Sequence, residues 1–381
     1  MGPLAGHRVL EFGSIGPGPM CAMLLADLGA DVLHFERPGG DELGLGTETR
    51  FNILLRNRPR VALDLKRPND AACVFEFIDR ADVLIEGYRP GAMERLGLGP
   101  DACFARNPRL VYGRMTGWGQ SGPLAKSAGH DLNYIALTGA LHAIGRAGSS
   151  PTPPLNLVGD FGGGALYLAF GIACALIEAK KSGKGQVVDA AMTDGAASLM
   201  TAFYGLQAAD LHNGERGTNV LDSGAPYYEV YRCKDGKYLS IAAIEPKFRA
   251  DLYRRLGFDP AGAHAASNPE TWPAEKQRIA GRIAEFTRDE WVRWFEGHDA
   301  CVAPVLSLAE APHHPHNEAR GTFVEIDGIM QPAPAPRFSP TVPQTPKPPA
   351  AGPIDLHDAL AAWGVDDQRI SELANSMQPA S

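Results

Sequence analysis

Two short segments of the chain carry side chains that could move protons. Gly129-His130-Asp131 precedes an apolar run that is typical of a helix. An imidazole changes its charge close to neutral pH, so His130 could act as an acid or as a base. Asp131 could cap the helix, and the free amide groups at its entrance could stabilise an oxyanion. A purely structural role for His130 stays open, because a lone histidine at a helix entrance is often only that.

The second segment offers a carboxyl group. Residues 156–160, Asn-Leu-Val-Gly-Asp, run directly into Phe161-Gly162-Gly163-Gly164. Three glycines allow the backbone to approach other backbone or a ligand closely. An acid held in such a place is poorly hydrated, and poor hydration raises its pKa toward the range useful for proton transfer. The alternative is that Asp160 only caps the next helix.

Basic residues gather in the first hundred positions, several of them just after expected strands. They are Arg37, Arg56, Arg58, Arg60, Lys66, Arg67, Arg89 and Arg95. Loops at the carboxyl ends of parallel strands line the ligand crevice of such a sheet, so cations there favour a ligand that carries several phosphates. A solvated charged surface is the alternative for any single member of the set.

Three other patterns carry less chemistry. The loop Gly16-Pro17-Gly18-Pro19 stands where a dinucleotide fingerprint would stand, but its prolines have no amide hydrogen to offer a pyrophosphate, so a tight strand-to-helix turn is favoured. His313, His314 and His316 are separated by prolines that break any helix able to align them on a metal. The six cysteines form no CxxC pair, which argues against a zinc site or a disulfide framework.

The composition is that of a globular chain. Of 381 residues, 44% are hydrophobic and 21% charged, which excludes fibrous and disordered classes. A formal net charge of -8 disfavours nucleic acid as a partner. No export signal is visible at the N-terminus, so we expect a cytoplasmic protein. The longest apolar stretch, from Ala165 to Ile177, is shorter than a membrane span and predicts a buried helix without membrane insertion.

Hydrophobic periodicity predicts an α/β chain with a Rossmann-like large domain and a smaller α+β domain. Strands are expected at 7–12, 31–35, 61–65, 83–86 and 110–112, and helices at 19–28, 70–80, 162–179 and 194–211. A hairpin around Asp235-Gly236 opens the smaller domain, which also holds polar helices near Trp291 and Trp294.

The expected domain limits follow from this pattern. Residues 1–190 form the large domain, 191–220 a helical linker and 221–330 the small domain. The proline-rich segment 331–353 is an extended return strap. Residues 335–381, with helices at 355–363 and 366–376, complete the large domain.

Read in order, several motifs resemble the class III CoA-transferase superfamily over nearly the whole chain, to about Trp363. They are Leu55-Arg56-Asn57-Arg58, Leu63-Asp64-Leu65-Lys66, Glu86-Gly87-Tyr88-Arg89-Pro90-Gly91, Gly129-His130-Asp131, the segment 156–164 and Gly183-Lys184-Gly185-Gln186-Val187-Val188-Asp189. The resemblance implies an interlocked homodimer and an acyl-CoA substrate. CoA is then part of the substrate, and no metal, pyridoxal phosphate or redox cofactor is implied.

The resemblance also assigns residues to the CoA thioester. The matching positions are Arg37, Leu63, Asp64, Leu65, Lys66, Gly87, Tyr88, Arg89, Arg95, Gly129, Leu132, Asn133, Tyr134 and Asn156. It agrees with the basic set found from the residues alone.

Within the superfamily the resemblance is to members that racemise 2-methylacyl-CoA thioesters. It implies that His130 and Asp160 are the acid-base pair, that the backbone amide of Asp131 binds the enolate oxygen, and that Glu245 of a partner subunit orients His130. The rival is a CoA transferase, in which Asp131 would form an acyl anhydride. A third alternative, a catalytically silent CoA-binding protein, is disfavoured because all acid-base positions are retained.

Overall fold

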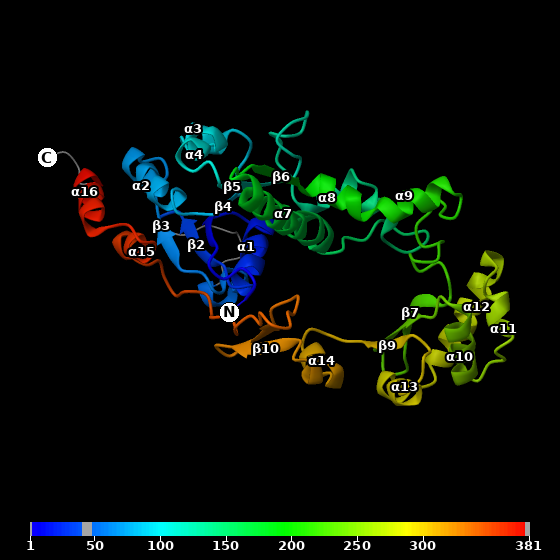
Figure 1. Ribbon diagram of the computed structural model, residues 1–381. Coiled ribbons are helices and arrows are strands. Elements are labelled where there is room, and N and C mark those ends of the chain that lie inside the picture. Colours follow the sequence, from blue (N-terminus) through cyan, green and yellow to red (C-terminus); the bar gives the residue numbers. More distant parts are fainter. Residues whose placement is uncertain (1, 40–47, 378–381) are drawn as a thin grey trace. The chain divides into compact units, whose positions relative to one another are not determined.

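The computed structural model describes residues 2–39 and 48–377, which fall into two compact units (Figure 1). The large unit comprises Met1–Thr138, Leu155–Leu199 and Gly321–Ser381, and the small unit comprises Gly139–Pro154 and Met200–Arg320. The boundary expected at residue 190 therefore lies after Leu199, and the expected linker is divided between the two units.

A six-stranded parallel sheet forms the centre of the large unit. Its order is β3-β2-β1-β4-β5-β6. The strands are β1 (Arg8–Phe12), β2 (Asp31–Glu36), β3 (Arg60–Ala62), β4 (Val83–Glu86), β5 (Val111–Thr116) and β6 (Val187–Ala191). The strand order reverses between β1 and β4, which is where open parallel sheets bind ligands at the carboxyl ends of their strands. The predicted α/β class is confirmed.

Alternate side chains of the strands point into two separate cores, as the period of a strand requires. On one face, Val9, Val32 and Ile85 pack with helices α1 (Pro17–Asp27) and α7 (Leu166–Ser182). On the other, Leu10, Leu33 and Leu84 pack against five other helices of the unit. These are α2 (Pro68–Ile78), α3 (Ala92–Arg95), α4 (Pro100–Arg106), α15 (Leu356–Ala362) and α16 (Asp367–Met377).

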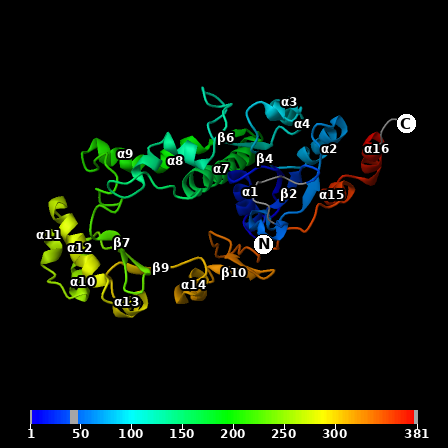
Figure 2. The same ribbon diagram turned by 180° about the vertical axis from the view of Figure 1, so that it is seen from behind.

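The C-terminal helices complete this second core. Helix α16 packs against α2, as both views show (Figures 1 and 2), and α15 contacts β3. The Trp363 indole meets Phe77 edge to face, with ring centroids 5.4 Å apart. Burial of Leu360, Trp363 and Leu373 therefore ties the end of the described chain to the first hundred residues.

Helix α7 is buried on only one side. Leu168, Ile172, Ala175 and Ala179, spaced by four or three residues, are buried against the sheet. Phe170 and Ile177 on other sides are each 71% exposed. Together with the π-helix that precedes it, the element spans Leu157–Ser182 and is long and apolar enough for a membrane span by length and composition, with 33% of its apolar window buried. The expectation of a buried helix is therefore wrong for the faces that carry Phe170 and Ile177.

Buried arginines hold the proline-rich return strap, residues 331–353, against the rest of the large unit. The Arg56 guanidinium donates to both Asp27 carboxylate oxygens, to Gln331 Oε1 at 2.9 Å and to the Pro332 carbonyl at 2.8 Å. Arg60 pairs with Glu36 at 2.7 Å and donates to the Ala350 carbonyl. Apart from the hairpin of β10 (Phe323–Ile326) and β11 (Ile329–Pro332), the segment up to α15 has no regular helix or strand, as its prolines predict.

The basic residues predicted from the sequence to bind phosphates therefore fall into a buried group and an exposed group. Arg58 pairs with Glu11 at 2.5 Å, and His34 Nδ1 lies 2.9 Å from the same carboxylate. Arg56, Arg58 and Arg60 are all buried in such pairs, so the prediction that they line a phosphate crevice is wrong. A charge in the core requires a partner, and the sequence offers carboxylates on the neighbouring strands and on α1.

The small unit is α+β. Its antiparallel sheet, in the order β7-β8-β9, consists of Tyr228–Arg232, Tyr238–Ala242 and Val302–Val305. Helices α10 (Pro246–Leu256), α11 (Gly262–Ala265), α12 (Trp272–Ile283) and α13 (Arg288–Phe295) enclose a core around Trp291. Helices α6 (Ala140–Ala143), α9 (Thr201–Ala208) and α14 (Pro315–Arg320) complete the unit.

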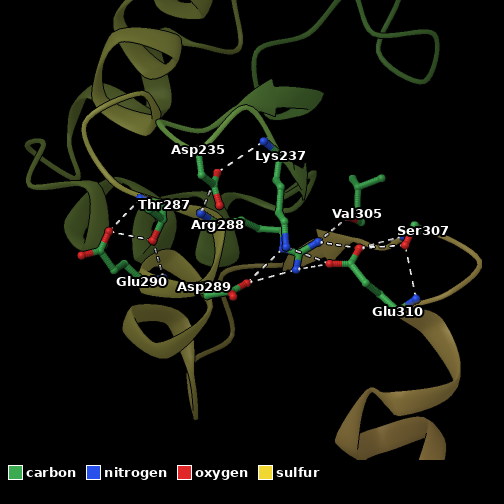
Figure 3. A network of polar contacts seen from close by, with 9 residues as sticks. All are labelled: Asp235, Lys237, Thr287, Arg288, Asp289, Glu290, Val305, Ser307 and Glu310. Carbon is green, nitrogen blue, oxygen red and sulfur yellow. Dashed lines mark hydrogen bonds and ion pairs between the residues drawn. The ribbon is translucent and has the colours of Figure 1, made fainter.

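A polar network joins the predicted Asp-Gly hairpin to α13 and to the turn after β9 (Figure 3). Arg288 donates to both Glu310 carboxylate oxygens, at 2.9 and 3.1 Å, and to the Val305 carbonyl at 3.0 Å. Lys237 reaches Glu310 Oε1 at 2.9 Å. These hydrogen bonds hold the pKa of Glu310 far below its usual range.

Candidate functional site

The carboxyl ends of β1, β4 and β5 open into a cavity of about 630 Å³ in the large unit. It is lined by the loops that follow these strands and by the residues before the short helix α5 (Asp131–Ala136). Both predicted acid-base residues line it, together with Arg37, Gly87, Tyr88, Arg89, Gly129 and Tyr134. The crevice expected from the sheet topology is thus a cavity that contains these two groups.

His130 is the residue before α5 and has an extended backbone, with φ -134° and ψ 173°. Its N–H donates to Asn133 Oδ1 at 3.1 Å, which satisfies an amide that the helix leaves free. The Tyr134 hydroxyl donates to the Gly129 carbonyl, and its ring meets Trp118 edge to face at 4.8 Å between centroids. The loop that carries His130 is therefore fixed from both sides while the imidazole stays exposed.

Asp160 lies in a π-helix, Leu157–Ala165, that leads into α7. Asn156 Nδ2 donates to Asp160 Oδ2 at 3.1 Å. Burial raises the pKa of the Asp160 carboxyl, the Asn156 hydrogen bond opposes this, and the nearby Asp131 charge raises it further. A carboxyl with a raised pKa can hold a proton to donate, which a general acid must do near neutral pH.

Asp131 is beside the cavity, but its side chain is not among the lining groups. It is 5% exposed, and its Oδ2 accepts the Asp160 backbone N–H at 2.6 Å. Its Oδ1 has no hydrogen-bond partner within the described part of the chain. The carboxylate of Asp131 therefore contacts the backbone of Asp160 and not the cavity.

Two glycines that the sequence reasoning did not assign to the site are required by close contacts. A Cβ on Gly16, which has φ +72°, would lie 2.8 Å from Asp160 Oδ2. A Cβ on Gly117 would lie 2.1 Å from the Tyr134 ring. The glycine-proline spacing after β1 is the sequence signal for Gly16, although by itself it predicts only a tight turn.

The residues predicted for CoA divide between two cavities. Arg37, Gly87, Tyr88 and Arg89 lie in the cavity with His130 and Asp160. Leu65, Lys66 and Arg95 line a second cavity of about 730 Å³, with Phe75, Arg106 and Arg369. Leu63 is buried in the core, and Asp64 accepts the Lys66 N–H at 3.1 Å. The predicted basic residues that are still free to bind a ligand therefore lie in these two cavities, Arg37 and Arg89 in the first and Lys66 and Arg95 in the second.

Leu132, Asn133 and Glu245 also lie outside these cavities, as do Asp131 and Asn156. Leu132 and Asn133 are exposed on α5. The Asn133 side chain accepts a hydrogen bond from the His130 backbone N–H. Glu245 is exposed in the small unit, directly before α10. Its predicted role toward His130 concerns a partner subunit and stays a prediction. In the described residues, no group of three or more histidine, cysteine or acidic side chains could hold a metal ion.

Comparisons with known proteins show the family to which the chain is related. The sequence pattern of CoA-transferase family III matches residues 4–354. The chain is 42% identical to the alpha-methylacyl-CoA racemase of Mus musculus over 374 residues, which are 97% of this chain and 96% of that protein. It is 41% identical to the enzyme of the same name from Homo sapiens, with the same coverage of 97% and 96%. The crystal structure of a CAIB/BAIF family protein from Brucella suis matches with a TM-score of 0.80, over 96% of this chain and 100% of that one, at 24% identity.

Proposed function

The chain belongs to CoA-transferase family III, and from this membership and its cavity we propose that it interconverts (R)- and (S)-2-methylacyl-CoA thioesters. One observation carries the proposal. His130 and Asp160 line the same cavity, while the carboxylate of Asp131 is buried beside it and engaged with the Asp160 backbone. This arrangement suits proton transfer better than a covalent step on Asp131, because a nucleophile must reach the substrate carbonyl.

Racemisation requires two groups in opposite protonation states. One takes the α-proton, the C–H electron pair moves into an enolate on the thioester oxygen, and the other returns a proton to the opposite face. A neutral His130 with a protonated Asp160, or a protonated His130 with an ionised Asp160, meets this requirement. The raised pKa of Asp160 favours its protonated form, which it must adopt in one direction of the reaction.

The enolate oxygen needs a hydrogen-bond donor. The backbone amide of Asp131 at the start of α5 is the donor we propose. Glu245 of a second subunit would orient the His130 ring. The thioester carbonyl itself accepts the electron pair, so the proposal includes no metal, pyridoxal phosphate or redox cofactor.

The CoA part of the substrate would follow the available cations. Arg37 and Arg89 lie in the cavity of the acid-base pair, and Lys66 and Arg95 lie in the second cavity. None of these four side chains is buried, so each can turn toward a phosphate. We propose that the phosphates of CoA bind along this path.

A second copy of the chain would cover the open side of α7. Leu166, Phe170 and Ile177 are 52%, 71% and 71% exposed, an apolar surface of a kind that marks an interaction site. We expect a homodimer in sedimentation experiments and a monomer for the double variant Phe170→Glu/Ile177→Glu. A monomeric wild type, or wild type that partitions into lipid vesicles, would contradict this part of the proposal.

Deuterium exchange tests the function. In deuterium oxide, a single enantiomer of a 2-methylacyl-CoA should lose optical activity while product and recovered substrate gain one deuterium at the α-carbon. His130→Ala and Asp160→Ala should each reduce the rate by about 10²- to 10⁴-fold, the usual contribution of one acid-base group. The exposed residues His316 and Asp101 provide matched controls, and their alanine variants should racemise normally. Unlabelled product from a panel of branched thioesters would reject the proposal.

A further inference from the structure

The Asp131 carboxylate is in an unusual position beside the acid-base pair. It is 5% exposed, and in the described part of the chain it takes part in no ion pair. Among the residues that the structure describes, its one side-chain hydrogen bond joins Oδ2 to the Asp160 N–H, at 2.6 Å and across 29 residues of sequence. A buried carboxylate is normally compensated by a cation or by several hydrogen-bond donors. The Asp131 carboxylate has neither in the described residues, so its contact with Asp160 indicates a functional role.

The backbone is shaped around this contact. A Cβ added to Gly159 would lie 2.6 Å from Asp131 Oδ2 and 2.9 Å from its Cγ. Gly159 therefore leaves the space in which the carboxylate reaches the next peptide group. The π-helix presents the Asp160 amide to that carboxylate and the Asp160 side chain to the cavity.

We propose that Asp131 is a positioning residue, whose carboxylate holds the Asp160 backbone and places a negative charge beside the Asp160 carboxyl. This inference rests on the proposed racemisation. The hydrogen bond fixes the direction of Asp160 toward the α-carbon, and the charge makes loss of its proton harder. Both effects serve a group that must donate a proton in one direction of the reaction and accept one in the other.

The other charged groups around Asp160 do not duplicate this effect. His130 stabilises the ionised form of Asp160, and Tyr134 is neutral with a raised pKa. Among the neighbouring elements, α8 (Met192–Leu199) carries Asp194, which is exposed, and β6 carries Asp189, which accepts the Gln120 N–H. On β5, Arg114 is engaged by Glu86 and Glu94, and on α1, Asp27 is engaged by Arg56.

The variants Asp131→Asn and Asp131→Ala separate the two effects. Asparagine keeps an oxygen for the Asp160 N–H and removes the charge. The acid limb of the pH profile of kcat/KM should then move to lower pH, because a proton leaves Asp160 more easily. The plateau should fall by about 10-fold, since a charge-assisted hydrogen bond becomes a neutral one. Alanine removes both the oxygen acceptor and the charge. The plateau should then fall by about 100-fold, because the Asp160 side chain loses its orientation.

The acid limb of the profile reports the coupled pair His130 and Asp160 and neither residue alone. The quantity to compare between variants is therefore the shift of this limb along the pH axis. Asp194→Asn removes an exposed charge from a helix that packs against the same π-helix, and it should leave the profile in place. Circular dichroism confirms that each variant is folded before its rate is compared.

Two results would overturn the inference. An unmoved acid limb in Asp131→Asn shows that the charge has no effect on the pair. Complete loss of exchange in a folded Asp131→Asn shows that the carboxylate has a covalent role. Failure of the proposed function is a different result, since wild type itself would then incorporate no deuterium at the α-carbon.

Discussion

Gly159→Ala tests the contact between Asp131 and Asp160 with a single methyl group. The added Cβ would lie 2.6 Å from Asp131 Oδ2, whereas ordinary contact begins at 3.4 Å, so the two segments must separate by about 0.8 Å. The added Cβ would also lie 3.1 Å from Ile135 Cγ2, so it cannot move in that direction without a second close contact. The clash is with a buried side chain, which cannot turn away into solvent.

A displacement of this size at a reacting group can reduce the rate by about 100-fold. Overpacking of a filled site lowers the free energy of unfolding by about 1 to 3 kcal/mol. We therefore expect deuterium exchange to fall by about two orders of magnitude and the urea midpoint to decrease.

The control is Gly281→Ala, on α12 in the small unit, where an added Cβ meets nothing within 4 Å. It should leave the rate unchanged and raise stability by about 0.5 to 1 kcal/mol, because alanine favours a helix more than glycine does. In an Asp131→Ala background the two shortest contacts, with Asp131 Oδ2 and Cγ, are absent, so Gly159→Ala should add little further loss. A wild-type rate for Gly159→Ala, or an equal loss in both backgrounds, would refute the reasoning.

The remaining predictions concern the supporting structure. Arg56→Met leaves the buried Asp27 carboxylate without its cation, with only the hydrogen bond from Asn57 Nδ2 remaining. The free energy of unfolding should fall by about 3 to 5 kcal/mol, with faster proteolysis of the return strap, and unchanged urea unfolding would contradict this. Glu310 has a lowered pKa in the folded state, so its stabilising contribution is complete above the pKa of an unfolded glutamate and is lost as the pH falls below it. Thermal unfolding of wild type and Glu310→Gln should therefore differ at pH 7 and converge in acid, and a constant difference would count against the network. Tyr134→Phe removes the hydroxyl that donates to the Gly129 carbonyl and should cost about 0.5 to 1.5 kcal/mol of stability, with a reduced exchange rate; normal values for both would show that this hydrogen bond does not fix the His130 loop.

The sequence predicted five of the six strands of the large sheet, because they are short apolar runs separated by clear turns, and it missed β6. Val83–Glu86 was predicted residue by residue, and β3 proved shorter than expected, since the chain after Ala62 leaves the sheet. The hairpin at Asp235-Gly236 followed from turn chemistry alone. Periodicity and turn residues are local signals, and local signals were sufficient for these elements.

Features that depend on distant contacts were not visible in the pattern. Arg56, Arg58 and Arg60 have the composition of a phosphate site, and only the fold places Asp27, Glu11 and Glu36 beside them. The apolar run of α7 gives no sign of which face the sheet leaves open. The π-helix and the contact between Asp131 and Asp160 likewise require the packing of segments far apart in sequence.

The central claim is that His130 and Asp160 act on opposite faces of one α-carbon, and enantiomer-specific exchange in deuterium oxide tests it most directly. Each variant, His130→Ala and Asp160→Ala, is incubated with the pure (R) and the pure (S) thioester, and α-deuteration is measured by mass spectrometry. The account predicts that neither variant inverts its substrate, that each still exchanges the α-proton of one enantiomer, and that the two variants exchange opposite enantiomers. Exchange of the same enantiomer by both variants would place the two groups on one face and contradict the account.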